Sequence, residues 1–501
     1  MKYSKIIFII IASLMFMSYC SRPKLSADRL VLLPVATDPT ISFRIYFKTG
    51  SQDDPVGKEG LAYLTAQMLT AAATEQDSYD EIIAKLFPLA ASYDATVSPE
   101  MTVIYGRVHK DNLQEFYPLF TNAILHPAFK EEDLTRLKSN VLNFLENELK
   151  YANDEELGKA VLYNEIFKGT GYGHLVEGTI SGIKAITLDD IKNFYKQKFN
   201  RQNFVAGLGG GYSEELVERL SKDLAQLPRG KANEIPKVMP YEIDGINVTI
   251  VEKNASASAI SIGFPISLTR GQKDWYALAL ANSWFGEHRN SSSHLYQVIR
   301  AARGLNYGDY SYIEHFPNGG RLQFPPVNVA RQQQIFEVWI RPVPNATRHF
   351  VLRTALRELQ MLVDNGLTPA QFDLTRNFLR KYVLHYAPTT MMRLGYAIDD
   401  KFYNVPGSHL ELFRNYLDSL TVNDINRVLQ NYLQYRNLQI VIVTNDAESL
   451  KNALVNNTPS PISYSTPKPA TVLQEDKSII NYPLNIKPEN IKIVKVEDLF
   501  L

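Results

Sequence analysis

Two short stretches of this 501-residue chain are near copies of each other and decide its architecture: TLDDI at residues 187–191 and TVNDI at residues 421–425. Each predicts the start of a helix, because the threonine oxygen can cap the first turn and the acid that follows favours the same helix end. Each helix is predicted to lead into a buried apolar strand, at residues 204–208 and 438–443. The chain therefore contains two related units.

A second match supports an internal duplication. The tetrapeptide DLTR occurs at residues 133–136 and again at residues 373–376, an offset of 240 positions. Asn203 and Asn437, which precede the two strands, share the 234-position offset of the two threonines. A loop insertion would produce the small difference between the offsets, so a duplicated domain accounts for both matches.

The pattern of apolar residues predicts the fold class. Strand signals are present at residues 41–48, 246–251 and 259–264, near the start of each unit. Long helical patterns follow at residues 131–149 and 347–363. This order predicts an α+β fold of two homologous domains, each with a mostly antiparallel sheet covered by helices.

The predicted organisation has four parts. They are a signal peptide at residues 1–20, a first domain at 21–230, a second domain at 231–455 and a Pro-containing tail at 456–501. The domain boundary falls in a polar connection that contains Pro and Gly. For the end of the tail, an edge strand and a disordered segment are both open.

The N-terminus predicts export. Lys2 and Lys5 precede an apolar run at residues 6–17, which suits a signal peptide and is short for a membrane span. Cys20, the only cysteine, stands where a lipidated residue would be left, so the segment resembles a bacterial lipoprotein signal, although Tyr19 replaces the usual small residue. An ordinary cleaved signal and a short membrane anchor are the alternatives. The expected location is the bacterial periplasm, with the protein anchored to the membrane through its lipid.

Composition gives no reason to expect a nucleic acid partner. Basic and acidic residues are equal in number, 53 of each, so the net charge is zero. The sequence has no Walker loop and no Gly-x-Ser-x-Gly elbow.

The stretch GLAYLTAQML at residues 60–69 predicts a core helix, with apolar residues at helical spacing. Its frame also resembles the zinc-site helix of the insulinase/pitrilysin (inverzincin) metallopeptidases, in which a His-x-x-Glu-His box lies in a Gly-Leu-Ala…Met-Leu setting. Here Tyr63, Ala66 and Gln67 occupy the three box positions. A phenol, a methyl group and an amide cannot together bind zinc and move the proton of its water.

The distal zinc ligand is also replaced. In the family it is a glutamate in a Val-Leu-Glu-Glu-like stretch, and the matching stretch here is VLNF at residues 141–144. Asn143 and Phe144 therefore stand at the two possible ligand positions. The resemblance covers roughly residues 30–455 and implies a half-shell of two domains, with no metal or other cofactor held by this chain.

The second half keeps a family feature. The segment SHLYQVIRAARGLNY at residues 293–307 resembles the family's Ser-x-Leu…Arg-x-x-x-Gly-Leu-x-Tyr segment. The resemblance implies that Arg300 and Tyr307 face a zinc site across the chamber and donate hydrogen bonds to substrate backbone and oxyanion. Two residues on one helix face are an ordinary structural alternative, and Arg303 competes with Arg300 if the alignment shifts.

Three hypotheses follow from this pattern. In two-chain members of the family one subunit carries zinc and its partner has lost the box, so the leading hypothesis is a non-catalytic, substrate-binding subunit of a heterodimeric zinc peptidase. Its expected partners are a catalytic subunit carrying His-x-x-Glu-His and zinc, and unfolded peptides. The alternative is an exported peptide-binding or structural scaffold. The third hypothesis, a peptidase acting alone with unrecognised ligands, is the weakest.

Overall fold

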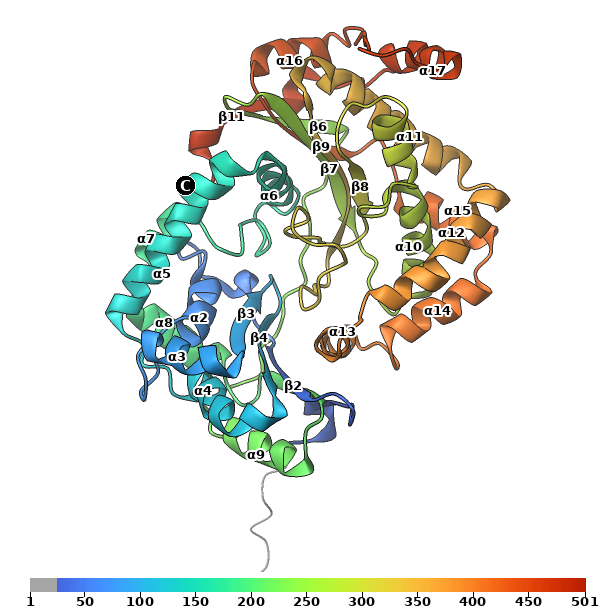
Figure 1. The fold of residues 1–501 in the computed structure, drawn as a ribbon. Coiled ribbons are helices and arrows are strands. Elements are labelled where there is room, and N and C mark those ends of the chain that lie inside the picture. Colours follow the sequence, from blue (N-terminus) through green and yellow to red (C-terminus); the bar gives the residue numbers. More distant parts are fainter. Residues whose placement is uncertain (1–24) are drawn as a thin grey trace, which may run out of the picture.

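The computed structural model describes residues 25–501, which form two lobes, each built around one sheet (Figure 1). The strand order is β1-β5-β2-β4-β3 in the first sheet and β11-β6-β10-β7-β9-β8 in the second. Without β11 the two orders are the same, strand for strand. The first sheet has one parallel pair, β1–β5, and the second has two, β11–β6 and β6–β10, while the remaining pairs are antiparallel. The predicted α+β fold with two homologous sheets is confirmed.

The strands of the first sheet are β1 (Leu30–Pro34), β2 (Thr40–Phe47), β3 (Ser92–Val97), β4 (Thr102–His109) and β5 (Phe204–Gly210). Those of the second are β6 (Ile246–Glu252), β7 (Ala257–Ile266), β8 (Asp309–Tyr312), β9 (Gln334–Pro344), β10 (Leu438–Thr444) and β11 (Ile491–Lys495). All five strands predicted from the sequence are present as β2, β5, β6, β7 and β10.

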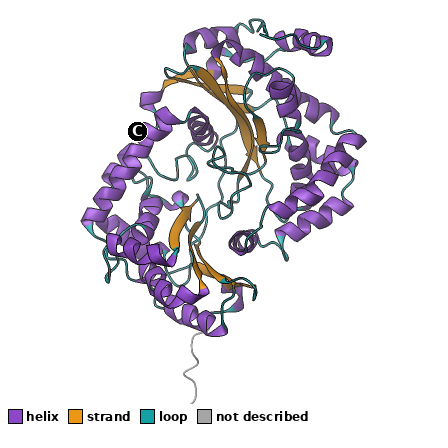
Figure 2. Ribbon diagram, in the orientation of Figure 1, coloured by secondary structure: helices purple, strands orange, loops and turns teal. Residues whose placement is uncertain are grey.

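The helices before the second sheet are α2 (Leu61–Thr70), α3 (Tyr79–Leu86), α4 (Leu113–Leu125), α5 (Glu131–Asn143), α6 (Asp154–Ile166), α7 (Ile180–Ala185), α8 (Leu188–Lys198) and α9 (Glu214–Leu224). Those that follow are α10 (Lys273–Gly286), α11 (Arg348–Asn365), α12 (Pro369–Tyr382), α13 (Thr390–Tyr403), α14 (His409–Ser419), α15 (Val422–Tyr432), α16 (Ala447–Val455) and α17 (Ala470–Ile480). Most helices lie on the outside and both sheets face the middle of the molecule (Figure 2).

The repeated sequence motifs become repeated local structures. The Thr187 hydroxyl caps α8 by accepting from the Asp190 N–H at 3.3 Å, and the Thr421 hydroxyl caps α15 by accepting from the Asp424 N–H at 3.3 Å. In both cases the aspartate also accepts from the backbone N–H of the threonine, which completes a capping box. The sequence pattern therefore specified both helix starts.

The two lobes exchange one helix each. Helix α6, which precedes the predicted boundary near residue 230, packs on β7, β9 and β10 of the second sheet. Helix α13, from the second half, packs on β1, β2 and β5 of the first sheet. The exchange is visible in Figure 1, where α6 lies beside the upper sheet and α13 beside the lower one. The predicted boundary therefore separates the sheets but not the hydrophobic cores.

Each exchanged helix carries a Leu-Gly pair where it meets its surroundings, Leu157-Gly158 in α6 and Leu394-Gly395 in α13. A Cβ on Gly158 would lie 3.3 Å from the hydroxyl oxygen of Ser261, an approach that a small shift relieves. A Cβ on Gly395 would lie 2.5 Å from a methyl carbon of Val327, which is far inside van der Waals contact. Gly158 of α6 therefore has more room for a side chain than Gly395 of α13.

The tail that the sequence left open is folded. Strand β11 adds a parallel edge strand beside β6, and α17 packs on α11. The last residues then reach the first lobe, where the Ile180 N–H donates to the Phe500 carbonyl at 2.8 Å and the Lys150 ammonium donates to the Glu497 carbonyl at 3.0 Å. The tail therefore contacts both lobes.

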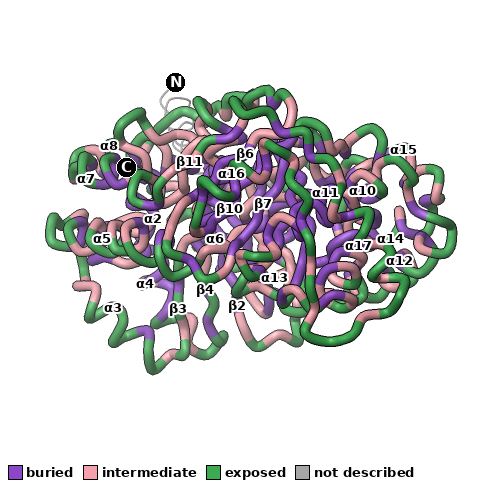
Figure 3. The backbone as a smooth tube through the Cα atoms, turned by 90° about the horizontal axis from the view of Figure 1, so that it is seen from above, coloured by how far each residue is buried: buried purple, intermediate pink, exposed green. Residues whose placement is uncertain are grey.

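Buried residues run through the middle of the molecule and exposed residues follow the peripheral helices and loops (Figure 3). Among residues 25–501, none of the helices combines the length and the apolar character that crossing a bilayer requires. Cys20 and the predicted signal peptide lie outside the described residues.

Candidate functional site

Helix α2 contains Tyr63, Ala66 and Gln67, the residues that the sequence resemblance places at the zinc-box positions, and local contacts fix where it starts. The Asp54 carboxylate accepts hydrogen bonds from the N–H groups of Gly60 and Ala62, both at 2.7 Å. Gly60 has φ = 102°, a left-handed conformation that glycine adopts without steric cost. The helix then packs against β3, α5 and α8.

The side chains at the box positions offer no ligand set. Ala66 is fully buried in the core of the first lobe, and Tyr63 and Gln67 are half-buried. Burial, and secondarily the negative charges of Glu177 and Asp94, raise the pKa of the Tyr63 phenol well above its ordinary value. The phenol of the metal-free chain therefore stays protonated at physiological pH.

The end of α5, which packs against α2, carries the other two replaced positions. There the helix continues as a π-helix, Phe144–Ala152. Asn143 is exposed, and its amide donates to the Glu148 carboxylate at 3.1 Å and accepts from Asn147 at 3.0 Å. Phe144 is half-buried and packs against the hydrophobic cores of both lobes. Neither side chain has the chemistry of the lost carboxylate ligand.

A metal does not fit elsewhere in the described chain. Within residues 25–501, no three His, Cys, Asp or Glu side chains lie together in an arrangement that could hold a metal ion. His288 and His294, six positions apart in the sequence, have other contacts: the His288 ring bonds the Tyr312 hydroxyl at 2.8 Å, and the His294 ring bonds the Glu358 carboxylate at 2.6 Å.

The structure brings Arg300 and Tyr307 side by side. Arg300 lies in a π-helical turn, Tyr296–Ala301, which Gly304 ends with φ = 73° and an N–H bond to the Arg300 carbonyl at 2.8 Å. The chain then returns so that the Arg300 guanidinium carbon lies 5.6 Å from the centre of the Tyr307 ring. Tyr307 is 77% exposed, so this pair can meet a molecule outside the chain.

Arg303, the competing candidate, faces inward. Its side chain is 1% exposed and donates to Glu475 at 2.7 Å, to Asp476 at 2.9 Å and to the Val298 carbonyl at 2.8 Å. All three guanidinium nitrogens are used inside the protein. Arg303 therefore anchors the segment, and its guanidinium is not available to substrate.

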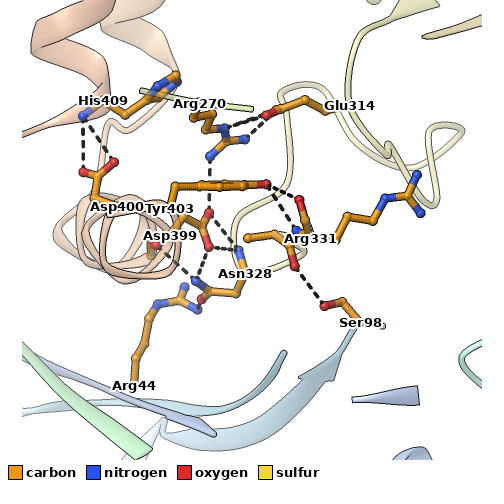
Figure 4. Close-up of polar contacts among 12 residues, drawn as sticks. Arg44, Ser98, Arg270, Glu314, Asn328, Arg331, Asp399, Asp400, Tyr403 and His409 are labelled. Carbon is orange, nitrogen blue, oxygen red and sulfur yellow. Dashed lines mark hydrogen bonds and ion pairs between the residues drawn. The ribbon is translucent and has the colours of Figure 1, made fainter. Parts of the chain in front are cut away.

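A buried polar network joins the two lobes (Figure 4). The Asp399 carboxylate on α13 pairs with Arg270 at 3.3 Å and accepts the Asn328 side-chain amide at 3.0 Å. Arg270 also pairs with Glu314 at 2.9 Å. The side-chain oxygen of Asn328 accepts a hydrogen bond from the Arg44 guanidinium on β2. Burial lowers the pKa of Arg44 to about 10, which leaves the guanidinium charged at physiological pH.

Sequence reasoning missed this network. Its members are spread from Arg44 to Asp399, and no local spacing connects them. One signal was available, because Arg44 lies between Phe43 and Ile45 in the strand predicted at residues 41–48. The face carrying Arg44 is covered by α13.

The chain is similar to known proteins of one family. Residues 30–179 match insulinase (peptidase family M16), and residues 185–379 match the peptidase M16 inactive domain. The non-peptidase homolog YmxG of Helicobacter pylori is 23% identical over 80% of this chain and 88% of its own length. An uncharacterized zinc protease of Rickettsia bellii is 24% identical over 56% of this chain and 66% of its own length.

The fold has been seen before. The crystal structure of a peptidase M16 inactive domain from Pseudomonas fluorescens superimposes with a TM-score of 0.73 and 22% identity, covering 84% of this chain and 96% of that one. The two matched family regions and the duplicated sheets lead to one assignment. The chain belongs to the insulinase family, peptidase family M16.

Proposed function

We propose that this protein is the non-catalytic, substrate-binding subunit of a heterodimeric M16 peptidase. One observation carries the proposal: the chain has lost all of the zinc-box side chains, yet Arg300 and Tyr307 lie together and Tyr307 is exposed. A core helix explains α2 without any function. The exposed Tyr307 phenol and the Arg300 guanidinium beside it are hydrogen-bond donors that a bound molecule can reach.

The pair can supply transition-state stabilisation in trans. A guanidinium and a phenol are both hydrogen-bond donors, and donors aimed at an oxygen that gains negative charge lower the barrier of peptide cleavage. Among residues 25–501 no group of side chains could hold zinc, so we assign zinc and its ligands to the proposed partner, which carries His-x-x-Glu-His. This chain contributes Arg300, Tyr307 and one half of the chamber that holds an unfolded peptide.

We further propose that the complex works outside the cytoplasm of a bacterium. The basic and apolar residues before Cys20 support export, and Cys20 supports attachment to the membrane through a lipid. Radiolabelled palmitate incorporation into the wild type but not into Cys20→Ala tests the lipid, and an unlabelled wild-type chain would contradict it.

The functional test uses the complex purified through a tag on this chain. Arg300→Ala and Tyr307→Phe are each expected to lower kcat for peptide cleavage by about 100–1000-fold, the effect of removing one oxyanion donor. Tyr241→Phe and Arg229→Ala, which change exposed side chains in the connection between the lobes, are the matched controls. Size-exclusion chromatography shows whether the variants still assemble.

Two outcomes decide against the proposal. Unchanged kcat in both Arg300→Ala and Tyr307→Phe removes the pair from the reaction. Recovery of a partner without His-x-x-Glu-His, and no cleavage that a zinc chelator abolishes, favours the exported scaffold instead.

A further inference from the structure

The Arg300–Tyr307 segment is held from behind by the C-terminal tail. The tail places two neighbouring acids of α17, Glu475 and Asp476, on the Arg303 guanidinium at 2.7 and 2.9 Å. Arg303 is three residues from Arg300, one helical turn along the same segment. Asp476 is itself 3% exposed, so this contact is desolvated and strong.

The third guanidinium nitrogen of Arg303 makes a hydrogen bond within the segment. It donates to the Val298 carbonyl at 2.8 Å, in the turn that carries Arg300. The Tyr464 hydroxyl, in the linker before α17, donates to the second carboxylate oxygen of Asp476 at 2.9 Å and fixes the orientation of that group. Arg303 therefore ties the Arg300 turn to two parts of the tail.

The other end of the segment joins the same network. His294 stacks on Trp284 with ring centres 4.4 Å apart, and its ring bonds Glu358 at 2.6 Å. Arg357, which bonds Glu358, also pairs with Glu475 at 3.1 Å. Glu475 thus links both ends of the segment, and the two ends are fixed together.

We infer that Glu475 and Asp476 of the tail are positioning residues, which hold Arg300 and Tyr307 in the geometry needed to act on a peptide bound to the partner. The inference rests on the proposed function for its catalytic consequence. The contacts of Glu475 and Asp476 with Arg303, which we call the clamp, are a property of this chain alone. In a chain without these acids the segment keeps its sequence, but the Arg300 turn loses the contacts that fix it.

The clamp is tested first in the isolated chain by hydrogen exchange. The amides of Gln297, Ala302, Gly304 and Leu305 are bonded within the segment and report its opening. Asp476→Asn is expected to speed their exchange by roughly 10-fold or more, since a charge-assisted hydrogen bond is weakened. Glu475→Gln, at a more exposed site, is the milder second variant in case Asp476→Asn misfolds. Glu489→Gln, an exposed acid of the same tail, is the control.

The positioning role is tested in the complex by measuring kcat in two backgrounds. Asp476→Asn is expected to lower kcat roughly 10-fold or more in the wild-type background, with little change in KM. In Arg300→Ala it is expected to lower kcat much less, because the group it positions is gone. A general loss of stability would lower kcat equally in both backgrounds.

The outcomes separate the two ideas. Unchanged exchange in Asp476→Asn and Glu475→Gln overturns the clamp. Faster exchange with equal losses of kcat in both backgrounds overturns the positioning role. Unchanged kcat in both Arg300→Ala and Tyr307→Phe overturns the proposed function, and with it the positioning role, whatever the exchange shows.

Discussion

The two exchanged helices occupy equivalent places in a duplicated fold, yet each is held by different chemistry. On α6, Lys159 is buried among aromatic rings of the second lobe, with its ammonium 4.9 Å from the centre of Trp339 and 5.1 Å from that of Tyr312. On α13, Asp399 anchors a chain of ion pairs and hydrogen bonds that reaches Arg270 and Asn328. Duplication kept the topology and left the contacts free to diverge.

The difference teaches which interface is sensitive to charge. A cation over aromatic rings keeps part of its stabilisation without a carboxylate partner. A buried ion pair loses far more when one member is removed, because the other is left charged and unpaired. The seating of α13 should therefore depend on one buried ion-pair network. Helix α6 instead combines packing with separate polar contacts, such as the bond from the Tyr163 hydroxyl to Glu337 at 2.7 Å and the Arg341–Glu155 pair at 3.0 Å.

The largest expected effect breaks the polar interface. Asp399→Ala leaves Arg270 with Glu314 alone and removes one of the two acceptors of the Asn328 side-chain amide, so we expect the free energy of unfolding to fall by about 3–5 kcal/mol. Urea unfolding measures the loss. Asp418→Ala, which removes an exposed pair with Arg380, is the control and should change stability by no more than about 1 kcal/mol. Equal losses in both variants would show that the network does not hold α13.

The next effect is a pH dependence caused by Asp400, which follows Asp399 on α13 and accepts a hydrogen bond from the start of α14. Burial raises the pKa of the Asp400 carboxyl from 3.8 to about 7. Between these values the folded chain keeps a proton that the unfolded chain has lost, so the carboxyl stabilises the fold at low pH and this contribution disappears as the pH rises through about 7. Between about pH 5 and 8 the wild type should lose about 2–3 kcal/mol relative to Asp400→Asn.

Asp400→Asn is a mild change, because the Asp400 carboxylate accepts the His409 N–H at 3.2 Å and an amide oxygen can still accept it. Unfolding titrations of both chains across the pH range measure the difference between them. Groups elsewhere in the chain that titrate in this range contribute to both chains and cancel in that difference. Parallel curves would contradict the prediction.

The smallest effect compares one substitution at the two Leu-Gly pairs. Gly395→Ala should destabilise by about 1–3 kcal/mol, because its Cβ would overlap the Val327 side chain. Gly158→Ala should stay within about 1 kcal/mol of the wild type, since the mild crowding by Ser261 is offset by the better helix propensity of alanine. Thermal melts of the two variants measure both. Similar melting temperatures would show that the two helices are seated alike.

Local sequence patterns predicted many of the helices and strands. The Thr-x-x-Asp motifs specified the starts of α8 and α15, and the apolar alternation located the strands, because caps and side-chain alternation are properties of short segments. The Leu-Gly pairs, at an offset of 237 between the two noted offsets, carried a further signal that went unread. Nothing local says that a helix packs on the sheet of the other lobe.

The candidate site divides in the same way. The zinc-box positions and the Arg300–Tyr307 spacing are sequence motifs, and the structure brings Arg300 and Tyr307 together. Arg303 was left as a competitor, because its partners lie more than 170 positions away in the tail and only the folded chain brings them together. Long-range pairing of charges is the information that one sequence does not display.

The helix exchange also determines when each lobe can be completed during synthesis of the chain. The last strand of the first sheet, β5, ends at Gly210, but the helix that covers one face of that sheet, α13, ends at Tyr403. At about 5–20 residues per second, a ribosome needs roughly 10–40 seconds to make the intervening chain. During that interval the first sheet waits without α13, while α6 meets β7 and β9 as they are made and must wait until Thr444 for β10. A chain cut near residue 230 would make this interval permanent, so the two lobes are not separable folding units.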